Sequence, residues 1–334
     1  MKRYFLDLRL YLYAGAFVIL LILPRVLSAY QLMMVESGLT YGVMALGLNL
    51  LLRYCGLLSF GHAAYFATGA YAVGLLNMYF PESFSFELAV VVALGSSFVV
   101  SALFGFLCVR NTRIFFSILT LALSMLIFAI LYKAYYYTGG SDGIRIEIPT
   151  FFGHEFEGMR RVHFLIGPYY YIVLGGFAIA VLLMRAIVSS PFGKALQATR
   201  DNELRAEMIG IRVRRYRWYA FVISGMCTGF AGALWSFVNG HITPEISDWV
   251  FSGEMVYMVL LGGFMVFEGP IVGAILFTYL KLYAIASTEY WMLIIGGTLV
   301  FLVLLLPGGV VGGIQSLYRR LRPDSAALQK ATSG

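Results

Sequence analysis

Long apolar runs separated by short polar stretches make up almost the whole of this chain. A bilayer core needs about 20 consecutive apolar residues for each helix, and runs of about that length recur along the sequence. The clearest are Leu10–Ala29, Leu32–Leu52, Ala63–Phe80, Leu88–Val109, Ile114–Tyr135, Ile166–Ile187, Trp218–Val238 and Met292–Pro307. The pattern predicts an all-α polytopic membrane protein with about ten transmembrane segments.

Glycine-rich breaks interrupt the apolar pattern at two places. The first precedes a helical run and contains Gly56, Ser59, Gly61 and His62. The second cuts the stretch Glu254–Ala286, which is too long for one span, and its residues are Gly262, Gly263, Glu268, Gly269 and Pro270. Gly-Ala follows each break, at Gly69 and at Gly273, which is weak support for an internal repeat.

Irregular backbone at membrane depth is tolerated where it is shielded by protein or lines a cavity. Paired broken helices are also the best sequence pointer to the substrate path of a transporter. We therefore expect the two breaks to lie on a translocation path. The alternative for each single glycine is close helix packing, since small residues let helices approach one another in membranes.

Ionisable residues in or beside the spans have simpler interpretations than catalysis. We expect His62 to be a neutral, hydrogen-bonded residue at a helix start, with a proton relay as the alternative. Glu254, Lys281 and Lys133 flank spans, where snorkelling or pairing accounts for them. Glu268 lies inside the second break, so a buried proton carrier is the alternative to pairing there.

Composition supports the membrane interpretation, because 60% of the 334 residues are hydrophobic and only 12% are charged. A soluble domain carries about 25% charged residues. The three cysteines, Cys55, Cys108 and Cys227, lie in or beside apolar runs and are expected to be small buried hydrophobes without a disulfide framework or metal spacing. The first apolar run, after Met1-Lys2-Arg3, resembles a secretory signal, but we interpret it as a retained span.

Charge separates between alternate loops, which predicts the orientation by the positive-inside rule. The basic set is Lys2, Arg3, Arg9, Arg53, Arg110, Arg113, the stretch Ser189–Arg217, Arg319, Arg320 and Arg322. The acidic set is Glu82, Glu87, Asp142, Glu147, Glu155, Glu157, Glu245 and Asp248. Both termini are thus expected in the cytoplasm and the loop 138–165 outside, with a permease domain over 1–312 and a cytoplasmic tail over 313–334. This distribution explains the net charge of +7 without nucleic acid.

No sequence motif for nucleotide hydrolysis or catalysis is present. The chain lacks a phosphate-binding G-x-x-x-x-G-K-[ST], a dinucleotide-binding glycine set, HExxH and any Cys/His cluster. An intramembrane enzyme is poorly supported, because Ser59 and His62 have no acidic partner nearby in sequence. Energy for transport would have to come from an ion gradient or from another subunit, and no cofactor is implied.

The polar stretch Ser189–Arg217, called the island below, has an ordered pattern. It carries seven basic residues against three acidic ones, a net +4. Pro191 suits a helix start, and Asp201 and Asn202 are good caps for a second helix over Glu203–Ile209. Gly210 is a suitable C-terminal stop. The pattern predicts a compact helix–turn–helix with its docking contact in Asn202–Gly210, and a basic run Arg212–Arg217 that mainly anchors the topology.

Within the island, NELRAEMIG resembles the Glu-Ala-Ala…Gly coupling loop of ABC importer permeases, matching at Glu203, Ala206 and Gly210, with Arg205 where that pattern often has Ala. The wider block PFGKALQATRDNELRAEMIGIRVRRYRWYAFVISGMCTGFAGAL resembles permeases of branched-chain amino acid ABC importers. GLLSFGHAAYFATGAY (56–71), TGGSDGI (138–144) and LLGGFMVFEGPIVGA (260–274) agree in order. The TGGSDGI block makes the chain resemble most the longer of the two paired permeases, which carries this block in its outer loop. The last block departs from the usual Gly-Gly-x-Gly-Thr-x-x-Gly-Pro.

The resemblance implies a permease subunit of an importer in a bacterial or archaeal cytoplasmic membrane. Its partners would be a homologous second permease, two cytoplasmic ATPases and a periplasmic or lipid-anchored binding protein that delivers a small molecule. The contact with the ATPases would use Arg200, Asp201, Asn202, Glu203, Arg205, Ala206 and Gly210. Urea or short-chain amides are an alternative cargo, because the family includes such importers. An ion-gradient-driven carrier using Glu268 or His62 is a different mechanism that the residues leave open.

Overall fold

The computed structural model describes Tyr13 and residues 15–111, 113–154, 156, 159–306 and 308–321, without the side chains of 113, 303 and 317–321. Several residues used in the sequence predictions lie outside the described set, namely Met1, Lys2, Arg3, Arg9, Leu10, Glu155, Glu157, Pro307 and Arg322. The predicted cytoplasmic tail is described only as far as residue 321.

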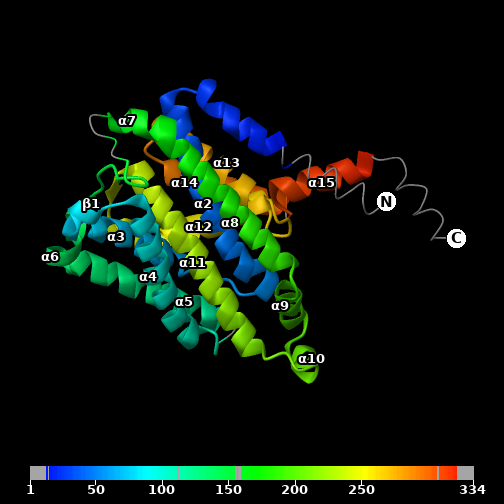
Figure 1. The fold of residues 1–334 in the computed structure, drawn as a ribbon. Helices are drawn as coiled ribbons and strands as arrows, with labels where there is room; N and C mark the ends of the chain where they lie inside the picture. The colour runs from blue at the N-terminus through cyan, green and yellow to red at the C-terminus, as the bar shows by residue number, and fades with distance from the viewer. Residues whose placement is uncertain are drawn as a thin grey trace.

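Helices form nearly all of the structure (Figure 1). An apolar helix Gly15–Arg25 comes first. The others are α2 (Ala29–Asn49), α3 (His62–Tyr79), α4 (Phe86–Cys108), α5 (Arg113–Lys133), α6 (Tyr135–Thr138), α7 (Arg161–Phe164), α8 (Tyr170–Ser189), α9 (Pro191–Asp201), α10 (Glu203–Met208), α11 (Val213–Asn239), α12 (Trp249–Gly262), α13 (Gly269–Ser287), α14 (Trp291–Leu305) and α15 (Gly309–Leu321). A two-residue antiparallel pair, β1 (Ile144–Arg145) with β2 (His241–Ile242), joins the loop after α6 to the end of α11.

The prediction of a polytopic all-α membrane protein is confirmed. Six helical segments within the described residues are long and apolar enough to cross a bilayer, and three shorter apolar helices accompany them. Within the described residues, each predicted run coincides with a helix, and the interrupted stretch Glu254–Ala286 is divided between α12 and α13. Both predicted breaks are therefore real interruptions of helical structure.

Helix α11 is the central element, buried along most of its length against α2, α3 and α4. Small residues allow this close approach. A Cβ atom on Gly69 of α3 would collide with the backbone carbonyl of Gly229, and one on Gly232 would collide with the carbonyl of Phe66. The apolar composition holds the chain in the bilayer, and these glycines determine which helices touch inside it.

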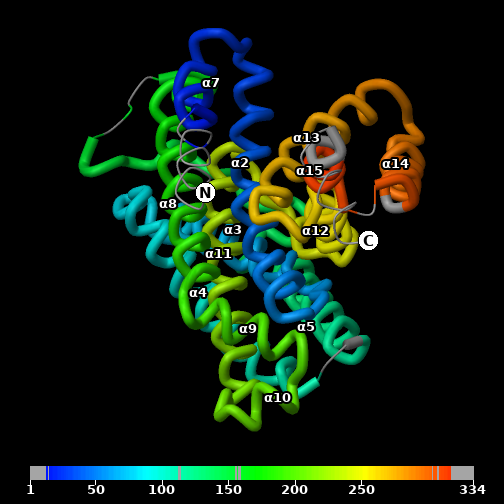
Figure 2. The backbone as a smooth tube through the Cα atoms, turned by 90° about the vertical axis from the view of Figure 1, so that its right-hand side faces the viewer, coloured from blue at the N-terminus to red at the C-terminus, as the bar shows by residue number. Residues whose placement is uncertain are grey.

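The island and the loop 138–165 lie at opposite ends of α11. Helix α10 comes just before α11 begins, and β2 follows immediately after it ends. The 27 residues of α11 span about 40 Å. Figure 2 shows α10 at one end of the molecule and α7 at the other. Arg53 lies at the α10 end, where its carbonyl oxygen accepts a hydrogen bond from Arg200.

Candidate functional site

The island folds as two consecutive helices that project from the bundle. Helix α9 begins after Ser190, whose hydroxyl accepts a hydrogen bond from the Gly193 amide at 3.5 Å, and Pro191 occupies its first turn. Proline suits this position because its missing N–H would have no partner within the helix. Leu196 and Thr199 are fully buried, so α9 is seated on the bundle by one face.

Helix α10 has a defined cap at each end. The Asn202 Oδ1 atom accepts a hydrogen bond from the Arg205 amide at 2.9 Å. At the other end, the Ile211 amide donates to the Ala206 carbonyl at 3.0 Å, and Gly210 adopts a left-handed φ of +87°. This is the glycine-terminated motif expected at a helix C-terminus. The predicted helix–turn–helix and both caps are confirmed.

One ion pair ties α10 to α11. The guanidinium of Arg217 donates two parallel hydrogen bonds, each 2.9 Å, to the two carboxylate oxygens of Glu203. The Arg217 side chain is only 7% exposed, whereas that of Glu203 is 46% exposed. The interpretation of the basic run as mainly a topology anchor stays a prediction, and Arg217 has a structural contact in addition, because it is buried and holds α10 in place.

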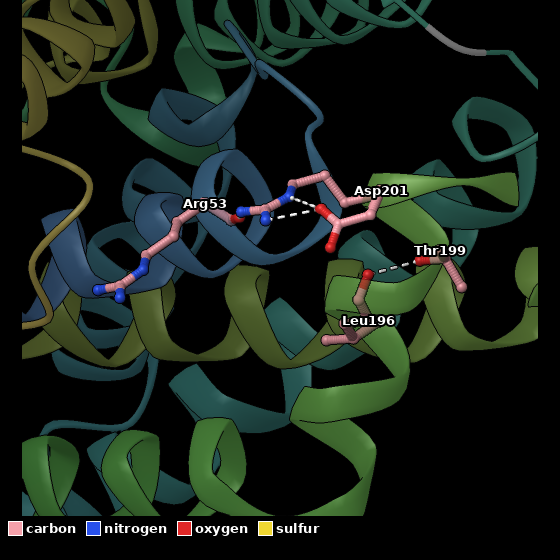
Figure 3. A network of polar contacts seen from close by, with 5 residues as sticks. Arg53, Leu196, Thr199 and Asp201 are labelled. Atoms are coloured by element: carbon pink, nitrogen blue, oxygen red, sulfur yellow. Dashed lines mark hydrogen bonds and ion pairs between the residues drawn. The ribbon is translucent and has the colours of Figure 1, made fainter. Parts of the chain in front are cut away.

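A second polar contact ties α9 to the end of the first broken helix. Arg200 donates to Asp201 Oδ1 at 2.7 and 2.9 Å and to the backbone carbonyl of Arg53 at 2.6 Å. In Figure 3, Asp201 lies on this contact while the Arg53 side chain points away from it. A Cβ on Gly56, which has a φ of +68°, would stand 2.8 Å from the Arg200 Cγ. The first break therefore begins against the island.

Large apolar side chains are exposed on α10 and just after it, beside the exposed charged residues Arg205 and Glu207. Leu204, Met208 and Ile209 are largely exposed, while Ala206 is buried against the bundle. The apolar residues of this segment therefore divide into three exposed residues and one buried residue. Exposed apolar side chains on a short helix that is capped at both ends and tethered by an ion pair form a rigid projection suited to docking.

In the first break, polar side chains satisfy the irregular backbone. The π-helical turn η2 (Leu50–Cys55) ends at Gly56, and α3 starts at His62. Thr120 accepts a hydrogen bond from the Phe60 amide at 3.2 Å. His62 is buried, with Nδ1 at 2.9 Å from the Ser59 hydroxyl and Nε2 at 2.7 Å from the Ser224 hydroxyl. The expectation of a hydrogen-bonded histidine at a helix start is confirmed.

In the second break, glycines allow backbone-to-backbone contact. A Cβ on Gly262 would collide with the carbonyl of Gly269, and one on Gly269 with the carbonyl of Gly263. Gly263 itself has a φ of +103° and contacts the backbone of Gly308. Pro270 is buried in the first turn of α13. Close packing is thus established at these glycines, and their place on a translocation path stays a prediction.

Glu268 lines a polar cavity of about 290 Å³ at the island end of the bundle. It accepts hydrogen bonds from Arg185 at 3.3 Å and from Tyr13. Its side chain is paired and 31% exposed, which supports the pairing interpretation. Arg53 lies on the same cavity.

Sequence reasoning missed or undervalued two features inside the spans. Glu36 of α2 is fully buried, and neither carboxyl oxygen has a hydrogen-bond partner among the described residues. Glu254 and Lys281 form a direct pair between α12 and α13. The sequence could have singled out Glu36, because it is an isolated glutamate within an apolar run. The pairing of Glu254 with Lys281, 27 positions later, has no local sequence signal.

Comparison of the sequence with models of protein families gives one matching family. The family described as the branched-chain amino acid transport system permease component matches residues 31–303, which is most of the chain. The match includes both breaks, the outer loop and the island. No solved structure matches this chain.

Individual relatives agree with that family. The high-affinity branched-chain amino acid transport system permease protein LivM of Escherichia coli K12 is 29% identical over 294 residues, covering 81% of this chain and 67% of the relative. A probable LivM permease of Methanocaldococcus jannaschii is 26% identical over 276 residues, covering 72% and 77%. The permease protein LivH of Escherichia coli K12 is 23% identical over 295 residues, covering 83% and 93%.

Proposed function

Because this chain belongs to the permease family of branched-chain amino acid transport systems, we propose that it forms one half of the translocation path of an ABC importer for branched-chain amino acids. It is a transport subunit of the membrane rather than an enzyme. The other half would be a homologous permease of the LivH kind, since relatives of both kinds match this chain. A periplasmic or lipid-anchored binding protein would deliver the ligand to the outer face.

The proposal rests on the rigid structure of α9 and α10. Coupling needs a rigid element that receives force from another subunit, and this helix pair is capped, tethered to α11 and tipped by Leu204, Met208 and Ile209. Two cytoplasmic ATPases would each receive one such projection, one from each permease. ATP hydrolysis is assigned to them because the sequence has no phosphate-binding loop of its own.

The proposed orientation places the island and both termini in the cytoplasm. The separation of charge supports it, since Arg53, Arg110 and the island gather at one end of α11 while Glu87 and Asp142 lie toward the other. Glu87 accepts a hydrogen bond from the Phe152 amide of the outer loop at 2.8 Å. The loop around β1 would then face the binding protein.

Two contacts provide a route for movement from the island into the bundle. The pair Glu203–Arg217 connects α10 to the start of α11, the helix at the centre of the bundle. Arg200 connects α9 to the carbonyl of Arg53 and lies against Gly56, where the first helix breaks. Displacement of α10 on ATPase closure would thus act on α11 and on the broken segment together, giving alternating access.

Site-directed cross-linking tests the docking assignment. Met208→Cys, at the tip of α10, should form a cross-link with an ATPase subunit in membranes that express the whole importer. Met159→Cys is the matched control, because Met159 is also exposed but lies in the loop 138–165 at the other end. A complex that co-purifies intact and cross-links equally at both positions, or at neither, would show that α10 is not the docking element.

A further inference from the structure

An ion pair lies inside the membrane-spanning part of the molecule. Lys281 Nζ donates to both carboxylate oxygens of Glu254, at 2.6 and 2.7 Å. Glu254 is five residues after the start of α12, and Lys281 is six residues before the end of α13. At 1.5 Å per residue, both lie about 8 to 9 Å below the helix ends, on the side of the bundle away from α10.

The pair is not sealed within the chain. The side chain of Lys281 is 29% exposed and that of Glu254 is 12% exposed. Charged groups facing lipid are expensive, and such residues face a bundle interior or a water-filled cavity and mark substrate pathways. The exposed side of this pair is therefore expected to meet a polar space rather than lipid tails.

Both partners also have unused hydrogen-bonding capacity. An ammonium has three donors and a carboxylate about four acceptor sites, and the contact between the two groups uses two donors and two acceptors. The remaining sites point to a ligand that offers both a cation and an anion. A zwitterion has this character, because its ammonium complements Glu254 and its carboxylate complements Lys281.

Aromatic side chains surround the pair. The Lys281 Nζ atom lies 5.5 Å from the ring centre of Trp291 and 6.0 Å from that of Phe277. Tyr257 packs edge-on against Phe277 at 5.0 Å, and its hydroxyl is buried with no hydrogen-bond partner among the described residues. Figure 2 shows α14, which begins at Trp291, at the edge of the molecule. Phe277 and Tyr257 are buried, so the exposed side of the pair has two opposite charges next to one partly exposed aromatic ring, that of Trp291.

We propose that Glu254 and Lys281 bind the zwitterionic head of an α-amino acid in transit, the ammonium on Glu254 and the carboxylate on Lys281. The apolar side chain of the ligand would lie against Trp291, the partly exposed ring beside Lys281. This inference rests on the proposed importer function and deepens it. It favours amino acids over urea and short amides, because neutral ligands have no charges with which to separate a lysine from a glutamate.

The test uses the whole importer in proteoliposomes and measures leucine uptake. In Glu254→Gln and in Lys281→Met, kcat/KM for leucine should fall about 10- to 100-fold, the worth of one charge-assisted contact. Basal ATP hydrolysis should stay within about twofold of wild type, since the pair is remote from the island. Glu82→Gln is the matched control, because Glu82 is an exposed carboxylate outside the spans and should transport normally.

A double variant separates ligand binding from a purely structural pair. Replacing a buried pair by apolar residues of similar volume is often neutral for stability, so Glu254→Leu with Lys281→Met should assemble but lose leucine uptake. Uptake at the wild-type rate in that variant would overturn the proposal. If the wild-type importer itself moved no amino acid, the importer function would fail instead, which is a distinguishable result.

Ligand binding to the wild-type importer tests the proposal even if the variants do not assemble. Leucine added to the purified wild-type importer, without its binding protein, should change the Trp291 fluorescence in a saturable way, with Trp291→Phe as the blank. Urea and acetamide should neither produce nor compete with this change. No leucine-dependent signal, or an equal signal from acetamide, would contradict a zwitterion site at this pair.

Discussion

The tether between α10 and α11 can be weakened by a single substitution, Glu203→Gln. In the wild type, both carboxylate oxygens of Glu203 accept hydrogen bonds from the Arg217 guanidinium. Glutamine keeps one acceptor oxygen and loses the charge. Arg217, whose Nε already has no partner among the described residues, would remain buried with an incomplete set of acceptors.

The size of the effect follows from the exposure of the two side chains. Breaking a fully buried ion pair costs about 3 to 5 kcal/mol, and a hydrogen bond to a charged group contributes about 1.5 to 3 kcal/mol. Arg217 is 7% exposed, but Glu203 is 46% exposed, so water can compensate part of the loss. We expect about 2 kcal/mol, equivalent to roughly 30-fold in the equilibrium for detachment of α10.

Hydrogen exchange of the α10 amides measures this equilibrium directly. Protection of residues 203–208 should fall by about 30-fold in Glu203→Gln, and the amount of leucine transported per ATP hydrolysed should fall with it. Glu207→Gln is the matched control, since Glu207 is exposed on the same short helix and should change neither quantity. Protection in Glu203→Gln within about twofold of wild type would refute a tethering role for the pair.

Three further substitutions test other contacts. In Gly210→Trp the new side chain has open space around it, and the left-handed backbone costs about 1 to 2 kcal/mol. The protein should therefore insert and fold, but transport should be uncoupled from ATP hydrolysis. Normal uptake by a well-expressed complex would contradict the coupling role of this turn. Gly69→Leu places a side chain against the Gly229 carbonyl and should lower the yield of folded protein, whereas Gly95→Leu has open space and should not. Equal yields of the two variants would show that the close contact between α3 and α11 does not depend on Gly69. Ser224→Ala removes a partner of His62 and should lower the unfolding temperature through a loss of about 1 to 3 kcal/mol; an unchanged midpoint in a thermal unfolding assay argues against that contact.

Much of the architecture was predictable because apolar length is a local property of the sequence. Within the described residues, each run long enough to cross a bilayer forms a helix. The helix start at Pro191 and the caps at Asn202 and Gly210 were predictable because capping depends on neighbouring residues. The positions of the two breaks followed from the glycines. These features need no knowledge of how distant segments meet.

The contacts of the candidate site were less accessible because they join distant positions. Nothing near Arg217 in the sequence distinguishes it from the other arginines of its run, yet it alone among them pairs with Glu203 in the described structure. Gly56 was expected on a path, and its contact with Arg200 depends on how α9 packs. Glu254 and Lys281 looked like flanking residues until α12 and α13 brought them together.

The central claim is that this chain moves amino acids only as part of an ATP-driven assembly. The most direct measurement is leucine uptake by proteoliposomes that contain this chain and its partner permease, with and without the two ATPases and ATP. We expect uptake that requires the ATPases and ATP and is indifferent to an uncoupler. Uptake by the chain alone, driven by an ion gradient and unaffected by ATP, would contradict it.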